Sequence, residues 1–90
     1  MLSKEITLDL KDGLEAKPAS EIIQFLKDFT SSITMKYGAS TANCKSIINL
    51  LALQAGANPT VQITVEGEDE AEELEEFIEF LEGIAKRIGD

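Results

Sequence analysis

The side chains of this chain that could take part in chemistry lie in two short segments, around Glu15 and around Ser46. Glu15 and Lys17 precede Pro18, which suits the first turn of a helix because its missing N–H is not needed there. A helix N-terminus attracts anions, and Lys17 adds a positive charge. Ser46 precedes an apolar run and is expected to be the N-cap of a second helix, where an added phosphate would be well tolerated.

The sequence contains no catalytic dyad, metal-ligand spacing or glycine-rich nucleotide loop, and it has no histidine. We therefore expect a protein that is not an enzyme and that needs neither a metal nor an organic cofactor. The single cysteine, Cys44, excludes an intramolecular disulfide, favours a reducing compartment such as the cytoplasm, and is expected to be a small buried hydrophobe. The first residues do not have the pattern of a signal peptide, and no apolar stretch is long enough to predict a membrane-spanning helix.

Acidic residues are numerous and unevenly distributed. The chain has 17 acidic and 8 basic residues, a formal net charge of −9. Positions 66 to 82 contain no lysine or arginine and carry Glu66, Glu68, Asp69, Glu70, Glu72, Glu73, Glu75, Glu76, Glu79 and Glu82. Such a surface repels nucleic acid and anionic lipid, so we expect neither as a partner. It either keeps a small protein soluble or meets a basic protein.

Hydrophobic periodicity predicts an α+β fold in a single domain, residues 1–90. Alternating apolar residues predict strands at 6–10, 33–37, 41–44 and 61–65. Helical spacing predicts three helices, which begin near Pro18, at Ser46 and after Asp69. The expected order is β-α-β-β-α-β-α, with the helices covering one face of a mostly antiparallel sheet.

The C-terminal helix has the clearest pattern. Asp69 followed by Glu72 resembles a capping box at its start, and Lys86 and Arg87 near its end suit the helix dipole. The carboxylates are expected to face solvent. The opposite face is expected to carry the apolar residues with helical spacing, which are Leu74, Phe77, Ile78, Leu81, Ile84, Ala85 and Ile88.

Three segments match the signatures of one known family. They are Gly13-Leu14-Glu15-Ala16-Lys17-Pro18-Ala19, Asn43-Cys44-Lys45-Ser46-Ile47-Ile48 and Glu66-Gly67-Glu68-Asp69-Glu70. The first resembles the active-site loop Gly-[Ile/Leu]-His-Ala-Arg-Pro-Ala of HPr, the phosphocarrier family of the bacterial sugar phosphotransferase system. The second resembles the region of its regulatory serine, and the third the acidic turn before its last helix. The resemblance implies the HPr-like open-faced β-sandwich, a four-stranded antiparallel sheet covered on one face by three helices.

The chain departs from this family where the phosphoryl group is carried. Glu15 stands in place of the histidine that accepts phosphate from phosphoenolpyruvate through enzyme I, and Lys17 replaces an arginine. A glutamate would form an acyl phosphate, which usually requires a bound divalent cation, and lysine lacks the bidentate fork of arginine. The resemblance is therefore to the Crh-like variants, which lack the active-site histidine.

The resemblance leaves two roles open for Glu15. A carboxylate at a helix N-terminus is favourable by roughly 0.3–1 kcal/mol, so Glu15 is either a stabilising surface residue or a permanent stand-in for the phosphorylated histidine. The stand-in is imperfect, because one carboxylate has less charge and fewer acceptor oxygens than a phosphate.

The resemblance also implies a regulatory site at Ser46. In Gram-positive relatives a bifunctional HPr kinase/phosphorylase modifies this serine, and the product is the corepressor of a catabolite control transcription factor. Both are implied partners, with enzyme I as a further candidate, and Lys45 is expected to pair with the phosphate or contact a partner. The apolar run after Ser46 cannot all face inward, so we expect Ile48 and Leu51 to be exposed, and with Ile47 to bind partners or to form a half-buried helix edge.

Three functions remain open on this basis. The leading hypothesis is a regulatory adaptor in carbon catabolite regulation, phosphorylated on Ser46 and unable to relay phosphate. The alternatives are a working phosphocarrier, with Glu15 or another residue as acceptor, and a docking decoy that is never phosphorylated.

Overall fold

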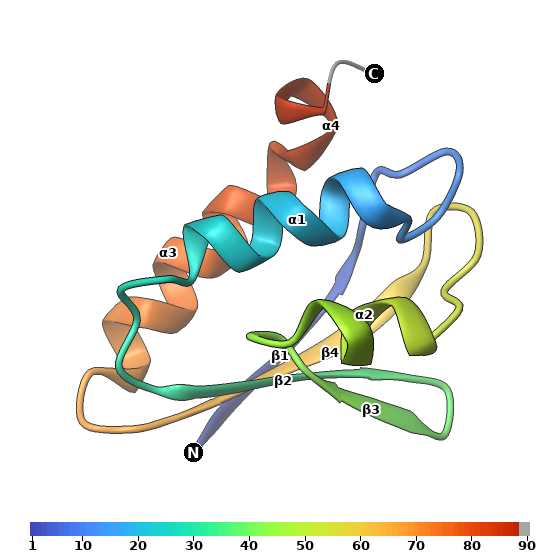
Figure 1. Cartoon of the computed structure of the whole chain (residues 1–90). Coiled ribbons are helices and arrows are strands. Elements are labelled where there is room, and N and C mark those ends of the chain that lie inside the picture. Colours follow the sequence, from blue (N-terminus) through green and yellow to red (C-terminus); the bar gives the residue numbers. More distant parts are fainter. Residues whose placement is uncertain (89–90) are drawn as a thin grey trace.

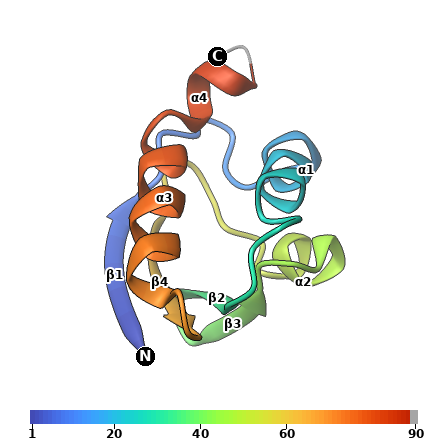
Figure 2. The same ribbon diagram turned by 90° about the vertical axis from the view of Figure 1, so that its left-hand side faces the viewer.

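Four antiparallel strands form one sheet in the order β1-β4-β2-β3, and all the helices lie on one side of it (Figures 1 and 2). The structure is a computed structural model and describes residues 1–88. The strands are β1 (Leu2–Thr7), β2 (Ser32–Tyr37), β3 (Ser40–Asn43) and β4 (Thr60–Glu66). In β2 and β4 buried and exposed side chains alternate, so one sheet face meets the helices and the other is open.

The helices divide the covered face between them. They are α1 (Ala16–Phe25), α2 (Ile47–Ala52), α3 (Glu70–Glu82) and α4 (Ile84–Arg87). Helix α3 packs on β1 and β4, α2 packs on β3, and α1 packs against α2. Because β1 and β3 are the two edges of the sheet, α2 and α3 lie over opposite halves of it. The predicted α+β architecture and the order of its elements through β4 are confirmed.

The first strand lies nearer the N-terminus than its hydrophobic pattern predicts. Strand β1 spans Leu2–Thr7, and Leu8 and Leu10 follow it although both are fully buried. The amide of Leu8 donates to the carbonyl of Pro59, its partner in the β1–β4 register, but Pro59 has no amide to return the bond. The amide of Leu10 donates to the carbonyl of Leu8, so the chain leaves the ladder after Leu8. The alternation therefore continues past the end of strand pairing, and Leu10 is buried although its amide bonds locally.

The C-terminal helix is interrupted, whereas its pattern predicts one continuous helix to residue 88. Helix α3 ends at Glu82, Gly83 follows, and α4 is a separate short helix from Ile84. A glycine inside a helix costs about 1 kcal/mol relative to alanine, so Gly83 is the position at which the predicted helix is least stable. The apolar face is also wider than predicted, because Phe80 is buried.

The predicted capping box of α3 is wrong. Asp69 is the N-cap, but its side chain makes no capping hydrogen bond. The Glu70 carboxylate accepts instead from the amide of Gly67, in the turn before the helix, at 3.3 Å, and it pairs with the amino group of Met1 at 2.8 Å. The hydrogen bond from that amino group is the main reason that the pKa of Glu70 is lowered.

Helix α2 ends at a residue with an unfavourable backbone conformation. Gln54, which follows the C-cap Leu53, has a φ of 52°. Left-handed backbone costs a non-glycine residue about 1–2 kcal/mol, part of which glycine would lose again through its greater freedom in the unfolded chain. We expect Gln54→Gly to raise the free energy of unfolding by about 0.5–1 kcal/mol in urea denaturation. The matched change in strand β4, Gln62→Gly, should lower it, and a loss of stability in both variants would contradict the argument.

Candidate functional site

Helix α1 presents an open N-terminus at Glu15. The helix begins at Ala16, so Pro18 lies inside its first turn and is buried, while Glu15 and Lys17 are exposed. Glu15 is the N-cap, with extended backbone and no capping hydrogen bond from its side chain. The first amides of a helix have no intrahelical acceptors, so this end is left to solvent or to an anion.

Two backbone loops hold this N-terminus in place. The amide of Leu14 donates to the carbonyl of Ala55 at 3.1 Å, and the amide of Asn58 donates to the carbonyl of Leu10 at 2.8 Å. Gly13 lies between these contacts with a φ of 80°, a conformation that glycine adopts without strain. The position of Glu15 is therefore set by the loop that follows α2 as well as by α1 itself.

The pocket beside Glu15 carries more negative than positive charge. It has a volume of about 230 Å³ and is lined by Asp12, Gly13, Glu15, Lys17, Pro18 and Ile88. Two carboxylates and one ammonium group therefore line the pocket, and the approach of a phosphoryl group would be opposed by the carboxylate charge. No cluster of three or more acidic or cysteine side chains placed to hold a metal ion occurs among residues 1–88.

Ser46 is the N-cap of α2, as predicted. Its backbone is extended, and its Oγ accepts from the backbone amide of Asn49 at 3.3 Å and from the Asn49 side-chain amide at 3.2 Å. The residue is half-buried, at the start of a helix whose next two residues are exposed. The hydroxyl is therefore positioned by the helix and remains within reach of solvent.

The ammonium group of Lys45 is bound elsewhere than at Ser46. Its Nζ donates to the carbonyl of Phe29 at 2.7 Å, in the loop between α1 and β2. This carbonyl already satisfies one donor of Lys45, so a phosphate on Ser46 would have to compete for the ammonium. Lys45 therefore connects the Ser46 region to the α1–β2 loop.

Glu73 is a buried acid, although the sequence predicts that the carboxylates of the last helix face solvent. This side chain is 9% exposed, and its carboxylate accepts from the amide of Thr30 at 3.1 Å and from that of Ser31 at 2.9 Å. Burial raises the pKa of Glu73, but the hydrogen bonds from these two amides and the charge of Lys45 help to bring it below its ordinary value. Its spacing of four residues from Phe77 was the one available sign that Glu73 faces inward.

Glu73→Gln is expected to lower the free energy of unfolding at pH 7 by about 1–2 kcal/mol, because a charge-assisted pair of hydrogen bonds becomes a neutral one. A lowered pKa means that the Glu73 carboxylate stabilises the fold above its unfolded pKa, about 4.3, and that this contribution disappears as the pH falls through the folded value. Urea denaturation curves of the wild type and Glu73→Gln should therefore differ at pH 7 and converge as the pH is lowered from 5 to 2. Glu72→Gln, on the exposed side of α3, is the control, and an equal effect of both variants would refute the role of Glu73.

An apolar surface follows Ser46 along α2. Ile48 is 75% exposed, Leu51 38% and Ile47 37%, whereas Leu50 of the same helix is fully buried. The predicted exposure of Ile48 and Leu51 is confirmed, and Ile47 joins them. We call these three residues the α2 patch. It lies between Ser46 at the start of α2 and the loop at its end that holds Gly13.

Cys44 is buried, as expected. Burial raises the pKa of its thiol to about 12, so the thiolate is scarce at neutral pH.

These features define a small α+β domain of the HPr type, with one exposed loop at the start of α1 and one serine at the start of α2. The family model described as the PTS HPr component phosphorylation site matches residues 2–83. The chain therefore belongs to the HPr family, and its relatives place it with the Crh-like members.

Two curated relatives and a solved structure illustrate the similarity. HPr-like protein Crh of Halalkalibacterium halodurans is 38% identical over 82 residues, which are 91% of this chain and 98% of the relative. HPr-like protein Crh of Bacillus subtilis is 32% identical over 91% of this chain and 96% of its own. The crystal structure of HPr-C-His from Thermoanaerobacter tengcongensis superposes with a TM-score of 0.85 at 28% identity, covering 93% of this chain and 94% of the other. None of the helices described among residues 1–88 is long and apolar enough to span a membrane.

Proposed function

We propose that this chain is a regulatory adaptor, phosphorylated on Ser46, that does not relay phosphate through position 15. The observation that carries the proposal is the contrast between the two sites. The hydroxyl of Ser46 is held at the start of a helix, beside an exposed apolar patch. The Glu15 pocket, in contrast, is lined by two carboxylates and one ammonium group. A phosphate is favoured at the first site and disfavoured at the second.

Phosphorylation would act at Ser46 with little change of fold. The phosphate oxygens would take over from Oγ as acceptors of the Asn49 amide, at the positive end of α2. The modification would add about two negative charges next to the α2 patch. A partner that buries the patch and offers a basic group to the phosphate would therefore distinguish the modified from the unmodified protein.

The proposed partners follow from family membership. A bifunctional HPr kinase/phosphorylase would modify Ser46 in the cytoplasm, and a catabolite control transcription factor would bind the phosphorylated form. The α2 patch, Ile47, Ile48 and Leu51, would be the apolar part of both interfaces, and enzyme I is a further candidate for the same surface.

The proposal is tested by incubating the chain with an HPr kinase/phosphorylase, ATP and Mg²⁺ and measuring intact mass with site mapping. We expect one phosphate on the wild type, none on Ser46→Ala, and one on the control Ser40→Ala, whose serine lies in β3. We also expect Ile48→Asp to lower the rate of modification at least tenfold, since it places a charge in an interface that must be desolvated. An unmodified wild type, with the kinase active on an ordinary HPr, would refute the adaptor hypothesis.

The exposure of the α2 patch also supports one alternative. If Ser46 stays unmodified and the chain still slows phosphorylation of an ordinary HPr by the same kinase, the docking-decoy hypothesis takes the place of the adaptor hypothesis. This competition should disappear in Ile48→Asp.

A further inference from the structure

A groove between α1 and α3 lies apart from the surfaces discussed so far. It has a volume of about 430 Å³, and we call it the phenylalanine groove; it is lined by Phe25, Glu76, Glu79, Phe80, Gly83 and Arg87. Helix α3 covers β1 and β4, whereas α2 covers β3, so the groove and the α2 patch lie over opposite halves of the sheet. The proposed chemistry of Ser46 makes no use of it.

Two stacked aromatic rings form the wall of the groove. Phe25 at the end of α1 stacks on Phe80 of α3, with ring centres 4.1 Å apart and planes 12° from parallel. Phe80 is almost fully buried, whereas Phe25 is only half-buried. Since the face of an aromatic ring carries negative electrostatic potential, a wall of this kind attracts cations as well as apolar groups.

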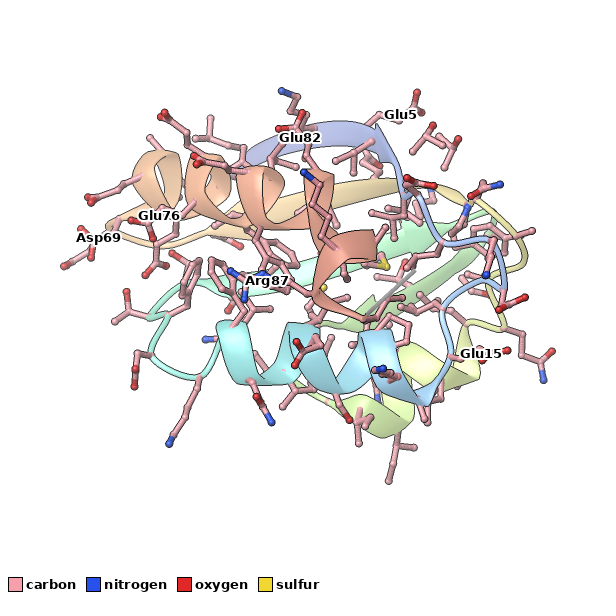
Figure 3. The ribbon with its side chains drawn as sticks, turned by 90° about the horizontal axis from the view of Figure 1, so that it is seen from above. Glu5, Glu15, Asp69, Glu76, Glu82 and Arg87 are labelled. Carbon is pink, nitrogen blue, oxygen red and sulfur yellow. The ribbon has the colours of Figure 1, made fainter. Side chains whose placement is uncertain are left out.

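A cation of the chain itself already lies in the groove. The guanidinium carbon of Arg87 is 4.8 Å from the ring centre of Phe80, and Figure 3 shows this side chain reaching back from α4 between α1 and α3. The only ion pair among residues 1–88 joins Met1 to Glu70, so none of the carboxylates of these residues pairs with Arg87, which has its aromatic contact. Its helix has four residues, of which Ile84 alone is buried, so few contacts hold Arg87 in this position.

The rim of the groove carries charge that Arg87 does not neutralise. Glu76 and Glu79 are both exposed, and the helix on which they lie has no basic residue. A planar guanidinium can stack on a phenylalanine ring and donate to a carboxylate at the same time, which an ammonium group does less well. An external arginine that made both contacts would have an advantage over Arg87, which makes one.

We infer that the phenylalanine groove is a docking site for an arginine side chain in a basic segment of a partner protein, and that Arg87 occupies the site until the partner arrives. The incoming guanidinium replaces Arg87 over Phe80 and pairs with Glu76 and Glu79. This contact is independent of Ser46, so a partner can use it whether or not the serine is phosphorylated.

The inference is tested by titrating the full chain with an oligo-arginine peptide at physiological salt, with calorimetry for affinity and amide NMR shifts for location. Shifts should centre on Phe25, Phe80, Gly83 and Arg87. Glu76→Gln should weaken binding about threefold, and the matched control Glu75→Gln, one residue away and outside the groove, should have less effect.

The role of Arg87 has its own test in the same titration. Arg87→Ala should strengthen binding about threefold, and more than Lys86→Ala, which removes the same charge from the same helix. An oligo-lysine peptide should bind more weakly than the oligo-arginine peptide. Equal effects of Glu75→Gln and Glu76→Gln, or of Lys86→Ala and Arg87→Ala, would show diffuse attraction to an acidic surface and would overturn the inference.

Discussion

Gly13→Ala is expected to lower the free energy of unfolding by about 3 kcal/mol, or to lower Tm by on the order of 15 °C. Gly13 has a φ of 80°, which costs alanine about 1–2 kcal/mol. The added Cβ would also collide with the carbonyl oxygen of Ala55, which is backbone and accepts from the amide of Leu14, so the two loops would have to separate. Such overpacking costs a further 1–3 kcal/mol, roughly. Thermal and urea denaturation measure the sum.

Gly38→Ala is the control that separates these two contributions. Gly38 has a similar φ of 60°, but a Cβ there would meet no atom within 4 Å. We therefore expect this variant to lose only about 1 kcal/mol. Equal losses in both variants would mean that the contact between the Gly13 loop and Ala55 contributes nothing to stability, and that another feature positions Glu15.

Glu15→His is expected to convert the chain from a protein that gains no phosphate from enzyme I and phosphoenolpyruvate into one that gains a single phosphate. The N-terminus of α1 is open, because no side chain of the described residues caps it, so a phosphohistidine would meet free amides there. The substitution also removes one of the two carboxylates of the pocket. Adding Lys17→Arg to Glu15→His should raise the rate of phosphorylation about tenfold. The reason is that arginine can donate a second charge-assisted hydrogen bond to the phosphoryl group, which contributes on the order of 1.5 kcal/mol.

Intact mass and acid lability give the readout for Glu15→His, because phosphohistidine hydrolyses in acid and phosphoserine does not. The gain should persist when Ser46→Ala is added. A phosphate on the wild type that is lost in Glu15→Gln would establish the carrier hypothesis instead. A folded Glu15→His variant that stays unmodified, beside an ordinary HPr that is modified, would show that the loop no longer fits enzyme I.

Local sequence patterns correctly predicted the strands and helices whose residue pattern is compatible with only one local structure. The alternation in β2 and β4 left only one way to bury Ile33, Met35 and their neighbours. The serine before an apolar run fixed the start of α2, because a hydroxyl at that place satisfies a helix amide that otherwise has no acceptor. The segments around Glu15 and Ser46 were sufficient for the family, which the match over residues 2–83 confirmed.

The same patterns misjudged residues whose burial depends on a second element. Leu8 and Leu10 alternate as in a strand, but the chain leaves the ladder after Leu8, because Pro59 has no amide to pair with it. Phe80 is buried because Phe25 of α1 stacks on it. From its sequence context Glu73 is expected to face solvent like the other acids of its helix. In the structure it is buried, because the amides of Thr30 and Ser31 donate to its carboxylate. Periodicity describes how one helix or strand divides its faces, and it contains no information about the donors that a distant loop will supply.

The sequence by itself therefore determined the class of fold, the family and the loss of the histidine. Only the tertiary structure decided the electrostatic setting of the two sites. It bonded the Lys45 ammonium group to the Phe29 carbonyl, the Glu73 carboxylate to the amides of Thr30 and Ser31, and the Leu14 amide to the Ala55 carbonyl. The physical reason is that electrostatic and hydrogen-bond energies depend on distances between atoms, and for residues far apart in the chain those distances exist only after the elements have packed.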